Sequence, residues 1–497
     1  MTMFAIVMSA ALVAFAALAE PVIDDSPTRV ESTLETGLEC IGTLRPRAVG
    51  EVKSSRWTLD CAGTDREHAD WRAVRDYVAP LGIARIRVQA GWARTEKDPG
   101  VYDFAWLDQI VFDAARRGIG VWMELSYGNP AYPGGGGRQL AGGMPSSEEA
   151  LSAWDRWVGL MAKRYAGVVK DWCVWNEPDL RAGGVVNSPE RAAAFAIRTA
   201  EAVRREIPDA TIAAFALSWA NAAFVKPLLE ELKARGKTGL FDTIAYHHYK
   251  ANPDDGYDEV EACRRVVAEY APNMRLREGE GGTLSEWCAV GALSRLPWTE
   301  LKQAKYDLRR ALGDLGHGDD TSVFHICDLE YRTSGFHDGL VRYGLLKTTG
   351  QADGFRVLKV KKSYYAVQNA VSVFNDSLVA EVGKGTSSLS GVARPAVYDW
   401  RDLRTGLKVA VFWDAAAMPR EECAAVRAEL RMRAEPFAAP VWVDVLTGNA
   451  YRLPPERMRR EGDFTVYAVP CYDSPAFVAD RSLLTLDESW EVRSRRH

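Results

Sequence analysis

The sequence predicts a (β/α)8 barrel followed by a smaller antiparallel β domain. Between about residues 57 and 374, short apolar runs alternate with amphipathic stretches, and eight of each occur in strict order. After about residue 378, the pattern changes to short runs of alternating polarity separated by turn signals. No Gly-x-Gly-x-x-Gly motif follows an early strand, which favours the barrel over an open, doubly wound sheet.

Each expected barrel strand is a short apolar run at the start of one βα unit. The eight strands are expected at residues 57–62, 83–90, 120–125, 168–175, 211–217, 241–248, 274–280 and 322–328. The helices between or after them are expected at 65–81, 106–117, 147–165, 189–207, 223–235, 258–271, 300–315 and 363–374. Ser147 is a candidate N-cap, because Glu148 and Glu149 follow it in a first helical turn.

These patterns divide the chain into four parts. Residues 1–19 are expected to be a signal peptide, and residues 20–55 an N-terminal segment that adds a strand to the β domain. Residues 56–377 are expected to form the catalytic barrel, and residues 378–497 the β domain, a small β-sandwich-like unit.

The first nineteen residues contain no charged side chain and end in Ala17-Leu18-Ala19, a small-x-small cleavage pattern. They resemble a secretory signal cleaved after Ala19, which predicts a secreted or periplasmic protein. A membrane anchor or a misassigned start codon is the alternative, since no Lys or Arg marks the beginning of the run. No other stretch approaches 18 uninterrupted apolar residues, so no membrane contact is expected after cleavage.

Composition narrows the classes of partner. The 497 residues include 62 Lys+Arg and 67 Asp+Glu, and the net charge of −5 disfavours nucleic acid or an anionic membrane as the main partner. The 16 Trp and 18 Tyr suit half-polar ligands such as sugars. Eight cysteines are too few for a disulfide scaffold, although Cys40 and Cys61 could form one bridge. No Cys-x-x-Cys pair occurs, and neither a metal nor another cofactor is expected.

Residues that can carry chemistry follow three of the expected strands. In a barrel of this kind the active site forms where strands end and βα loops begin. The fourth strand runs into Trp175-Asn176-Glu177-Pro178, the sixth ends in Tyr246-His247-His248-Tyr249, and the seventh ends in Glu278-Gly279-Glu280. Two carboxylates, one on the fourth strand and one on the seventh, are therefore expected to face each other across the barrel mouth.

Trp175-Asn176-Glu177-Pro178 resembles the acid/base motif of the retaining glycoside hydrolases of clan A. Asp98-Pro-Gly-Val-Tyr-Asp-Phe104 is similar to the clan's "pG-x-Y-d-F" loop, and the resemblance covers about residues 57–374. It implies a retaining β-glycosidase with a saccharide or glycoside substrate, in which Glu177 is the general acid/base and Glu280 the nucleophile. The sugar, the linkage and the choice between exo and endo action are not specified by these motifs.

The chemistry of glycoside hydrolysis explains the need for two carboxyl groups. The transition state resembles an oxocarbenium ion, so one carboxylic acid protonates the leaving oxygen while the other, as an anion, bonds to the anomeric carbon. The charge on the second carboxylate raises the pKa of the first, and this charge disappears when the sugar esterifies it. Glu177 is then expected to activate water.

Glu278 competes with Glu280 for the role of nucleophile. The two residues are two apart and are expected to share one strand face. Glu280 is favoured because it ends the strand and Gly281-Gly282 opens the loop, as at the nucleophile position of the clan. Glu278 would then be a supporting group or a salt-bridge partner deeper in the barrel.

The resemblance also implies roles for residues around the pair. Asn176 is expected to bond the sugar 2-OH, and His247 and Tyr249 match the clan's His-x-Tyr, in which the Tyr hydroxyl reaches the nucleophile. Arg87 resembles the strand-two Arg that steadies the same carboxylate, with a buried ion pair as the alternative. Gln89, on the same strand face as Arg87, is a further candidate for sugar binding. Four residues in loops at strand ends are candidates for either sugar binding or core packing: Trp92, Tyr127, Asn129 and Trp219.

The sequence departs from the clan at the eighth strand. Many clan members have a Trp platform there, whereas this chain reads Phe324-His325-Ile326-Cys327-Asp328. Trp287, just beyond the seventh strand, is a possible replacement.

Two other classes of function remain open at this point. One is a metal-dependent hydrolase that uses His247, His248, His325 and Asp328, although adjacent His residues point to opposite strand faces. The other is a non-catalytic carbohydrate-binding barrel, which would be expected to have lost one of the two carboxylates.

Overall fold

A computed structural model describes residue 30 and residues 34–180, 187–332 and 339–488. The expected signal peptide, residues 1–19, lies outside the described residues. Among the helices of the described part, none is long and apolar enough to cross a membrane.

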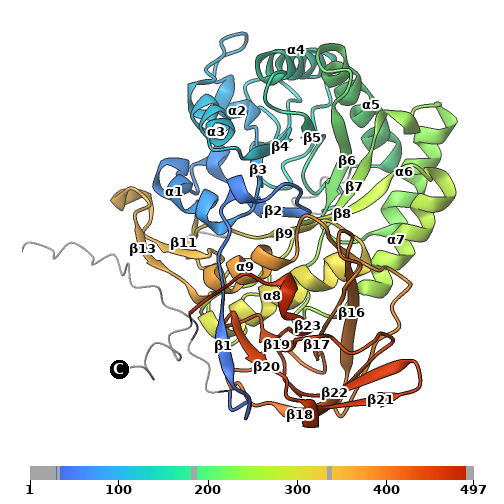
Figure 1. Cartoon of the computed structure of the whole chain (residues 1–497). Coiled ribbons are helices and arrows are strands. Elements are labelled where there is room, and N and C mark those ends of the chain that lie inside the picture. The colour runs from blue at the N-terminus through green and yellow to red at the C-terminus, as the bar shows by residue number, and fades with distance from the viewer. Residues whose placement is uncertain (1–29, 31–33, 181–186, 333–338, 489–497) are drawn as a thin grey trace, which may run out of the picture.

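Eight parallel strands form a nearly closed barrel in the upper part of Figure 1, so the predicted fold class is confirmed. They pair in the order β8-β7-β6-β5-β4-β3-β2-β9. Their bounds are β2 (Trp57–Asp60), β3 (Arg85–Gln89), β4 (Gly120–Glu124), β5 (Asp171–Cys173), β6 (Thr211–Leu217), β7 (Thr243–His247), β8 (Arg275–Glu280) and β9 (Thr321–Val323). Parallel bridges from Arg277 to Asp320 and from Gly281 to Val323 bring β8 and β9 together and close the ring.

Helices surround the barrel and cover its apolar strands (Figure 1). They are α1 (Trp71–Leu81), α3 (Ala105–Arg116), α4 (Glu148–Tyr165), α5 (Pro189–Glu206), α6 (Ala222–Ala234), α7 (Tyr257–Tyr270), α8 (Glu300–His317) and α9 (Lys362–Val373), with one extra turn, α2 (Trp92–Thr95). The expected cap is confirmed, because Ser147 accepts a hydrogen bond from the backbone N–H of Ala150 at 3.1 Å.

The eighth strand is shorter than the sequence predicts. It ends at Val323, and beyond this end the N–H groups of Ile326 and Asp328 donate to the carbonyls of Asp60 and Leu346. Two hairpins follow before α9, formed by β10 (Leu329–Tyr331) with β11 (Gly339–Val341) and by β12 (Leu346–Thr348) with β13 (Val357–Val360). The sequence analysis did not predict these hairpins.

The C-terminal region forms two antiparallel sheets (Figure 1). The larger has the order β14 (Leu378–Ala380), β16 (Pro395–Asp402), β17 (Lys408–Asp414), β23 (Ala476–Asp480), β19 (Pro440–Asp444), β20 (Asn449–Arg452), β1 (Cys40–Leu44) and β24 (Leu486–Asp487). The smaller has the order β15 (Ser388–Ser390), β18 (Val426–Met432), β22 (Phe464–Cys471) and β21 (Met458–Glu461). The N-terminal segment thus contributes the strand β1 to the larger sheet.

The bridge considered between Cys40 and Cys61 is not formed. Cys61 is a free thiol in the barrel core, whereas Cys40 lies in the apolar core between the two sheets. The two residues are close in sequence, but β1 and β2 belong to different layers of the molecule.

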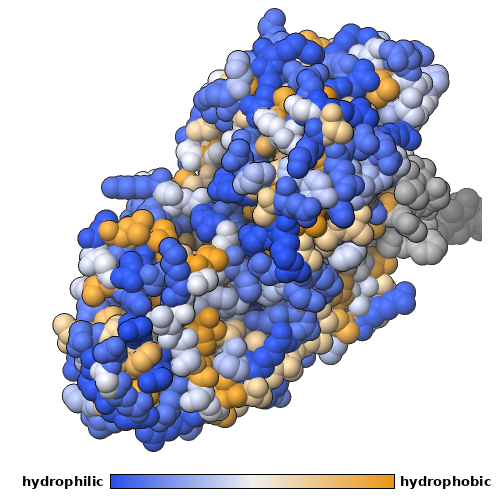
Figure 2. All heavy atoms as spheres, turned by 90° about the vertical axis from the view of Figure 1, so that its right-hand side faces the viewer, coloured by the Kyte–Doolittle hydropathy of each residue, from blue (hydrophilic) through white to orange (hydrophobic). Residues whose placement is uncertain are grey.

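The larger sheet packs one face on the smaller sheet and the other on the barrel. Trp400, Trp413 and Phe477 of this second face belong to the same apolar cluster as the barrel core. Polar contacts cross the same boundary, because Lys305 of α8 is paired with Asp473 at 2.8 Å and both side chains are buried. The face of the molecule shown in Figure 2 is mostly hydrophilic, with small apolar groups among the polar ones.

Removing the β domain is therefore expected to disrupt the barrel. A chain that ends at Asp376 would expose the apolar faces of α8 and α9 and would leave Lys305 without its carboxylate. We expect aggregation or a clearly lowered melting temperature, measured by size-exclusion chromatography and thermal unfolding. A soluble, monodisperse chain with an unchanged melting temperature would contradict this expectation.

Candidate active site

The two candidate carboxylates lie together at the carboxyl end of the barrel. Glu280 is the last residue of β8, and Glu177 stands four residues after the end of β5. Three atoms lie within 4.8 Å of one another: a carboxylate oxygen of Glu177, a carboxylate oxygen of Glu280 and a ring nitrogen of His247. The structure thus brings together residues from three separate βα units.

Glu280 is placed to remain an anion. Its Oε1 accepts a hydrogen bond from Arg87 Nη1 at 2.5 Å, and its Oε2 accepts one from the Tyr249 hydroxyl at 3.0 Å. Burial alone would raise the pKa of Glu280, but the charges of His247 and Arg87 and these hydrogen bonds outweigh it and lower the pKa below its usual range. A buried carboxylate of this kind is a suitable nucleophile.

Glu177 is placed to hold a proton. Burial and the nearby charge of Glu280 raise its pKa, while the hydrogen bond and charge of His247 act in the opposite direction. Its Oε1 lies 2.7 Å from Nδ1 of His247, whose ring is fully buried. Glu177 also has a positive φ of 48°, an uncommon conformation for a residue other than glycine and one that is concentrated at functional sites.

Glu278 and Glu280 do not share a strand face, and the expectation that they would is wrong. Tyr246 pairs with Glu278 and the next residue, His247, pairs with Glu280, so β8 contains a bulge at Gly279. Glu280 consequently points to Arg87 inside the barrel, whereas Glu278 Oε2 accepts from the N–H of Ser322 at 2.7 Å. Burial and the charge of Asp314 raise the pKa of Glu278 well above its usual range. These contacts separate Glu278 from the carboxylate pair.

Arg87 is the centre of a buried charge network. Its guanidinium donates to Asp60 at 2.6 Å, to Glu124 at 2.5 Å and to Asn176 Oδ1 at 2.7 Å, in addition to Glu280. The side chain is completely buried, so both interpretations of Arg87, as a buried ion pair and as the support of Glu280, hold at once. Asp60 and Glu124 were missed in the sequence, although an acidic residue inside an apolar strand is a signal that a buried cation faces it.

Asn176 and Gln89 belong to the same network. Asn176 Nδ2 donates to the Tyr127 hydroxyl at 2.7 Å, so its amide is held on one side by Arg87 and on the other by Tyr127. Gln89 Nε2 donates to Glu124 at 3.0 Å, and Gln89 Oε1 accepts from Arg66. The guanidinium of Arg66 in turn lies over the Tyr127 ring, 4.8 Å from its centroid.

The structure does not bring Trp92 and Asn129 to the carboxylate pair. The indole N–H of Trp92 donates to Glu96 at 2.6 Å, and Asn129 Nδ2 donates to the carbonyl of Glu96 at 2.7 Å. The Trp92 ring is fully buried and stacks on Tyr132, as a core residue does. Trp219 and Trp287 are exposed, at 43% and 62%.

An aromatic wall stands beside Glu280, and two of its members, Tyr331 and Tyr343, come from the segment of hairpins that the sequence analysis did not predict. The Tyr249 ring packs edge-on against Phe324, which packs edge-on against Tyr343 at 5.1 Å. Burial raises the pKa of the Tyr331 hydroxyl in β10, and the charges of Glu280 and Glu177 raise it further.

The four residues considered for a metal-dependent hydrolase do not converge. His248 bonds to the Asp255 carbonyl at 2.8 Å, and His325 contacts the Ala62 carbonyl at 3.0 Å. Asp328 is paired with Lys361 and Arg342. Glu177, His247 and Glu280 do cluster, and Oε1 of Glu280 is already paired with the Arg87 guanidinium.

No family model and no curated protein matches the sequence. The structure is similar to that of a family 39 glycoside hydrolase from Bacteroides cellulosilyticus WH2, with a TM-score of 0.61 and 16% identity over 86% of this chain and 81% of that one. It is also similar to a monomeric β-xylosidase from Caulobacter crescentus CB15, with a TM-score of 0.55 and 15% identity over 89% and 97%. A family 30 endoxylanase from Clostridium papyrosolvens C71 has a TM-score of 0.53 and 11% identity over 89% and 99%.

This chain shares its overall architecture with these three solved structures. The coverage of nearly the whole of each chain means that the similarity includes both the barrel and the β domain. At these identities the similarity concerns the fold, and the chemistry rests on the geometry of Glu177, Glu280 and their partners.

Proposed function

We propose that this protein is a retaining β-glycosidase that hydrolyses its substrate through a covalent glycosyl-enzyme intermediate. The observation that carries the proposal is a close pair of buried carboxyl groups with opposite pKa shifts, raised in Glu177 and lowered in Glu280. At the same pH, one carboxyl group of such a pair is protonated and the other is an anion. Acid-assisted nucleophilic displacement requires this combination.

The spacing of the pair supports retention over inversion. Retaining enzymes have carboxyl groups about 5–5.5 Å apart, whereas inverting enzymes need about 6.5–9.5 Å to admit a water molecule. An oxygen of Glu177 and one of Glu280 lie within 4.8 Å. This close approach favours the retaining arrangement, in which Glu280 attacks the anomeric carbon directly.

The surrounding residues divide the remaining tasks. Arg87 and Tyr249 hold the two oxygens of Glu280 in a fixed orientation, so little reorganisation is needed at the moment of attack. Glu177 gives its proton to the leaving oxygen and, once Glu280 is esterified, takes a proton from water. Asn176, fixed by Arg87 and Tyr127, is the candidate partner of the sugar 2-OH.

A panel of chromogenic aryl β-glycosides tests this function. The xyloside is the first candidate, since a β-xylosidase and an endoxylanase share the fold, and gluco, galacto and manno analogues complete the panel. We expect turnover of at least one member that is lost in Glu280→Ala. If no member is hydrolysed while saccharides bind in a calorimetric titration, the chain is a carbohydrate-binding barrel instead.

The pH dependence of activity follows from the raised pKa of Glu177 and the lowered pKa of Glu280. Activity requires Glu280 deprotonated and Glu177 protonated, so kcat/KM should rise through the lowered pKa of Glu280 and fall through the raised pKa of Glu177. His247 lowers both values, through its charge near Glu280 and its hydrogen bond to Glu177. Replacing His247 by Asn is therefore expected to move both limbs of the profile to higher pH.

The measurement is kcat/KM against pH for the natural chain and His247→Asn, with an aryl glycoside whose leaving group requires protonation. His248→Asn is the matched control, because the neighbouring ring faces the Asp255 carbonyl and not the carboxylates. An unchanged or acid-shifted profile in His247→Asn would contradict the proposed role of this residue.

A further inference from the structure

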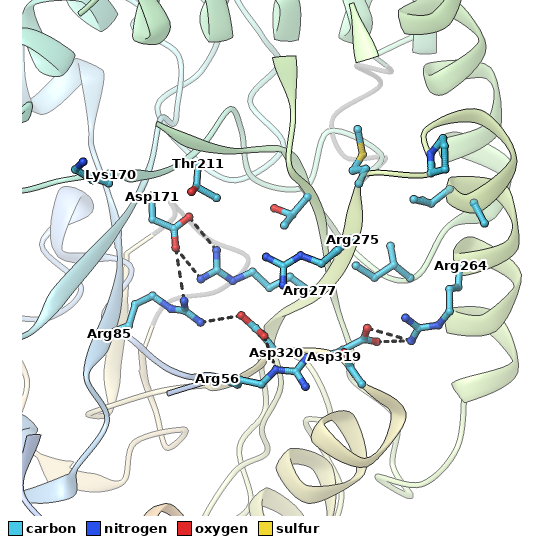
Figure 3. Close-up of a pocket in the computed structure, with 17 residues that line it drawn as sticks. Arg56, Arg85, Lys170, Asp171, Thr211, Arg264, Arg275, Arg277, Asp319 and Asp320 are labelled. Carbon is cyan, nitrogen blue, oxygen red and sulfur yellow. Dashed lines mark hydrogen bonds and ion pairs between the residues drawn. The ribbon is translucent and has the colours of Figure 1, made fainter. Parts of the chain in front are cut away.

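A second cavity lies at the opposite end of the barrel from Glu177 and Glu280. Its volume is about 520 Å³. It is lined by the first residues of five strands, namely Arg85 of β3, Asp171 of β5, Thr211 of β6, Thr243 of β7 and Arg275 of β8. Figure 3 shows this pocket, with charged side chains extending into it from separate strands. We call it the amino-end pocket.

The inner ion pairs of the amino-end pocket leave positive charge in excess. Arg56 and Arg85 share Asp320, at 2.8 and 3.1 Å, and Arg277 donates to Asp171 at 2.8 and 3.0 Å (Figure 3). Two carboxylates thus face three guanidinium groups, which leaves a net positive charge. Lys170 and Arg264 also line the pocket and have carboxylate partners of their own, Asp209 and Asp319.

Arg275 adds a further positive charge. It lines the pocket, is exposed to solvent, and has no ion pair among the described residues. Because Arg275 and Arg277 are two apart on the regular first part of β8, their side chains extend on the same side of that strand. In Figure 3 both guanidinium groups reach into the pocket.

Two buried hydrogen-bonding groups on the pocket wall lack partners. Nε of Arg277 and the hydroxyl of Thr243 have no hydrogen-bond partner within the described chain, although these residues are only 3% and 4% exposed. An unsatisfied buried donor costs free energy unless a ligand or solvent completes it. Burial lowers the pKa of Arg85, and the nearby charge of Arg277 lowers it further.

We propose that the amino-end pocket binds a small phosphate-bearing anion, with Arg275, Arg277 and Thr243 as its principal contacts. Guanidinium groups match phosphate oxygens in charge and geometry, and the anion would offset the repulsion among the pocket cations. The cavity is larger than inorganic phosphate alone and falls in the range of pockets for small organic ligands. This site is separate from the carboxylate pair and does not depend on glycosidase activity.

Isothermal titration of the full chain tests the proposal. The probes are inorganic phosphate and glucose 6-phosphate, both at an ionic strength held constant with sodium chloride. We expect saturable binding of one equivalent. Tighter binding of glucose 6-phosphate would identify an organic phosphate as the ligand, and equal binding of both would identify the free anion.

Variants locate the binding site. Arg275→Gln is expected to weaken binding about tenfold or more, the loss typical of one charge-assisted hydrogen bond, and Thr243→Val is expected to weaken it less. Arg265→Gln is the matched control, because Arg265 is an exposed residue of α7 that does not line the pocket. Arg275→Gln should keep the melting temperature of the ligand-free chain, since the side chain is exposed and makes no ion pair within the described residues.

Two results would overturn the proposal. The first is the absence of saturable binding of either probe to the natural chain. The second is an equal loss of affinity in Arg265→Gln and Arg275→Gln, which would show a general response to surface charge.

Discussion

Replacing Glu280 by Ala is expected to reduce hydrolysis of every substrate by on the order of 10⁵-fold, because no covalent intermediate can then form. The loss should not reflect unfolding. Arg87 keeps Asp60 and Glu124 as partners when Glu280 is removed, so its buried charge remains compensated. The measurement is kcat/KM for an aryl glycoside, together with the melting temperature of the variant.

Glu278→Gln is the matched control for this substitution. Burial and the charge of Asp314 raise the pKa of Glu278, which favours its neutral form, and Gln is neutral and reproduces its shape and its acceptor toward Ser322. Activity should therefore persist. Treatment of the natural chain with an activated 2-deoxy-2-fluoro glycoside, followed by mass spectrometry, should label the peptide at Glu280. A label on Glu278, or an inactive Glu278→Gln beside an active Glu280→Ala, would assign the nucleophile to the other residue.

Replacing Glu177 by Ala should have an effect that depends on the leaving group. For substrates whose leaving oxygen requires a proton, we expect a loss of about 10²–10⁴-fold, the usual contribution of general acid catalysis. A substrate with an activated leaving group should still glycosylate Glu280, and the intermediate should then accumulate for want of a base. Azide needs no general base, so it should restore turnover and yield a β-glycosyl azide.

Burst kinetics and product analysis with and without azide measure this effect. Asp179→Ala is a suitable control, because Asp179 lies two residues away and its carboxylate accepts hydrogen bonds from Ser218 and Asn221. If Glu177→Ala loses activity equally with good and poor leaving groups and azide has no effect, Glu177 is not the acid/base.

The sequence was sufficient for the parts of the fold that depend on local pattern. Apolar runs and amphipathic stretches mark βα units, and the barrel follows from eight of them in order. The same reasoning locates Glu177, His247 and Glu280, because the carboxyl ends of parallel strands meet at one end of a barrel. The structure indeed brings these three residues within 4.8 Å of one another.

Features that depend on three-dimensional context were not accessible in this way. The bulge at Gly279 turns Glu278 and Glu280 to different sides of β8, and a simple two-residue period cannot show it. Asp60 and Glu124 are acidic residues inside apolar strands, a pattern that signals a buried cation nearby. Only the fold shows that both side chains face Arg87. The position of Trp92, just after a strand end, suggested a ligand-binding residue. In the structure its ring packs against Tyr132 and Trp154 in the core.

The hairpins after β9 are a third example. They are three- and four-residue strands, too short for a reliable alternation of polar and apolar side chains. Tyr331 and Tyr343 come from this segment, so the aromatic wall beside Glu280 could not be assembled from sequence pattern alone.

The stereochemistry of the first product tests the central claim most directly. Proton NMR spectroscopy during the first turnover of an aryl β-glycoside distinguishes the α from the β anomer before the free sugar mutarotates. With carboxylate oxygens within 4.8 Å, two successive displacements at one carbon should release the β anomer. Release of the α anomer would show a single displacement by water and would contradict the assignment of Glu280 as a nucleophile.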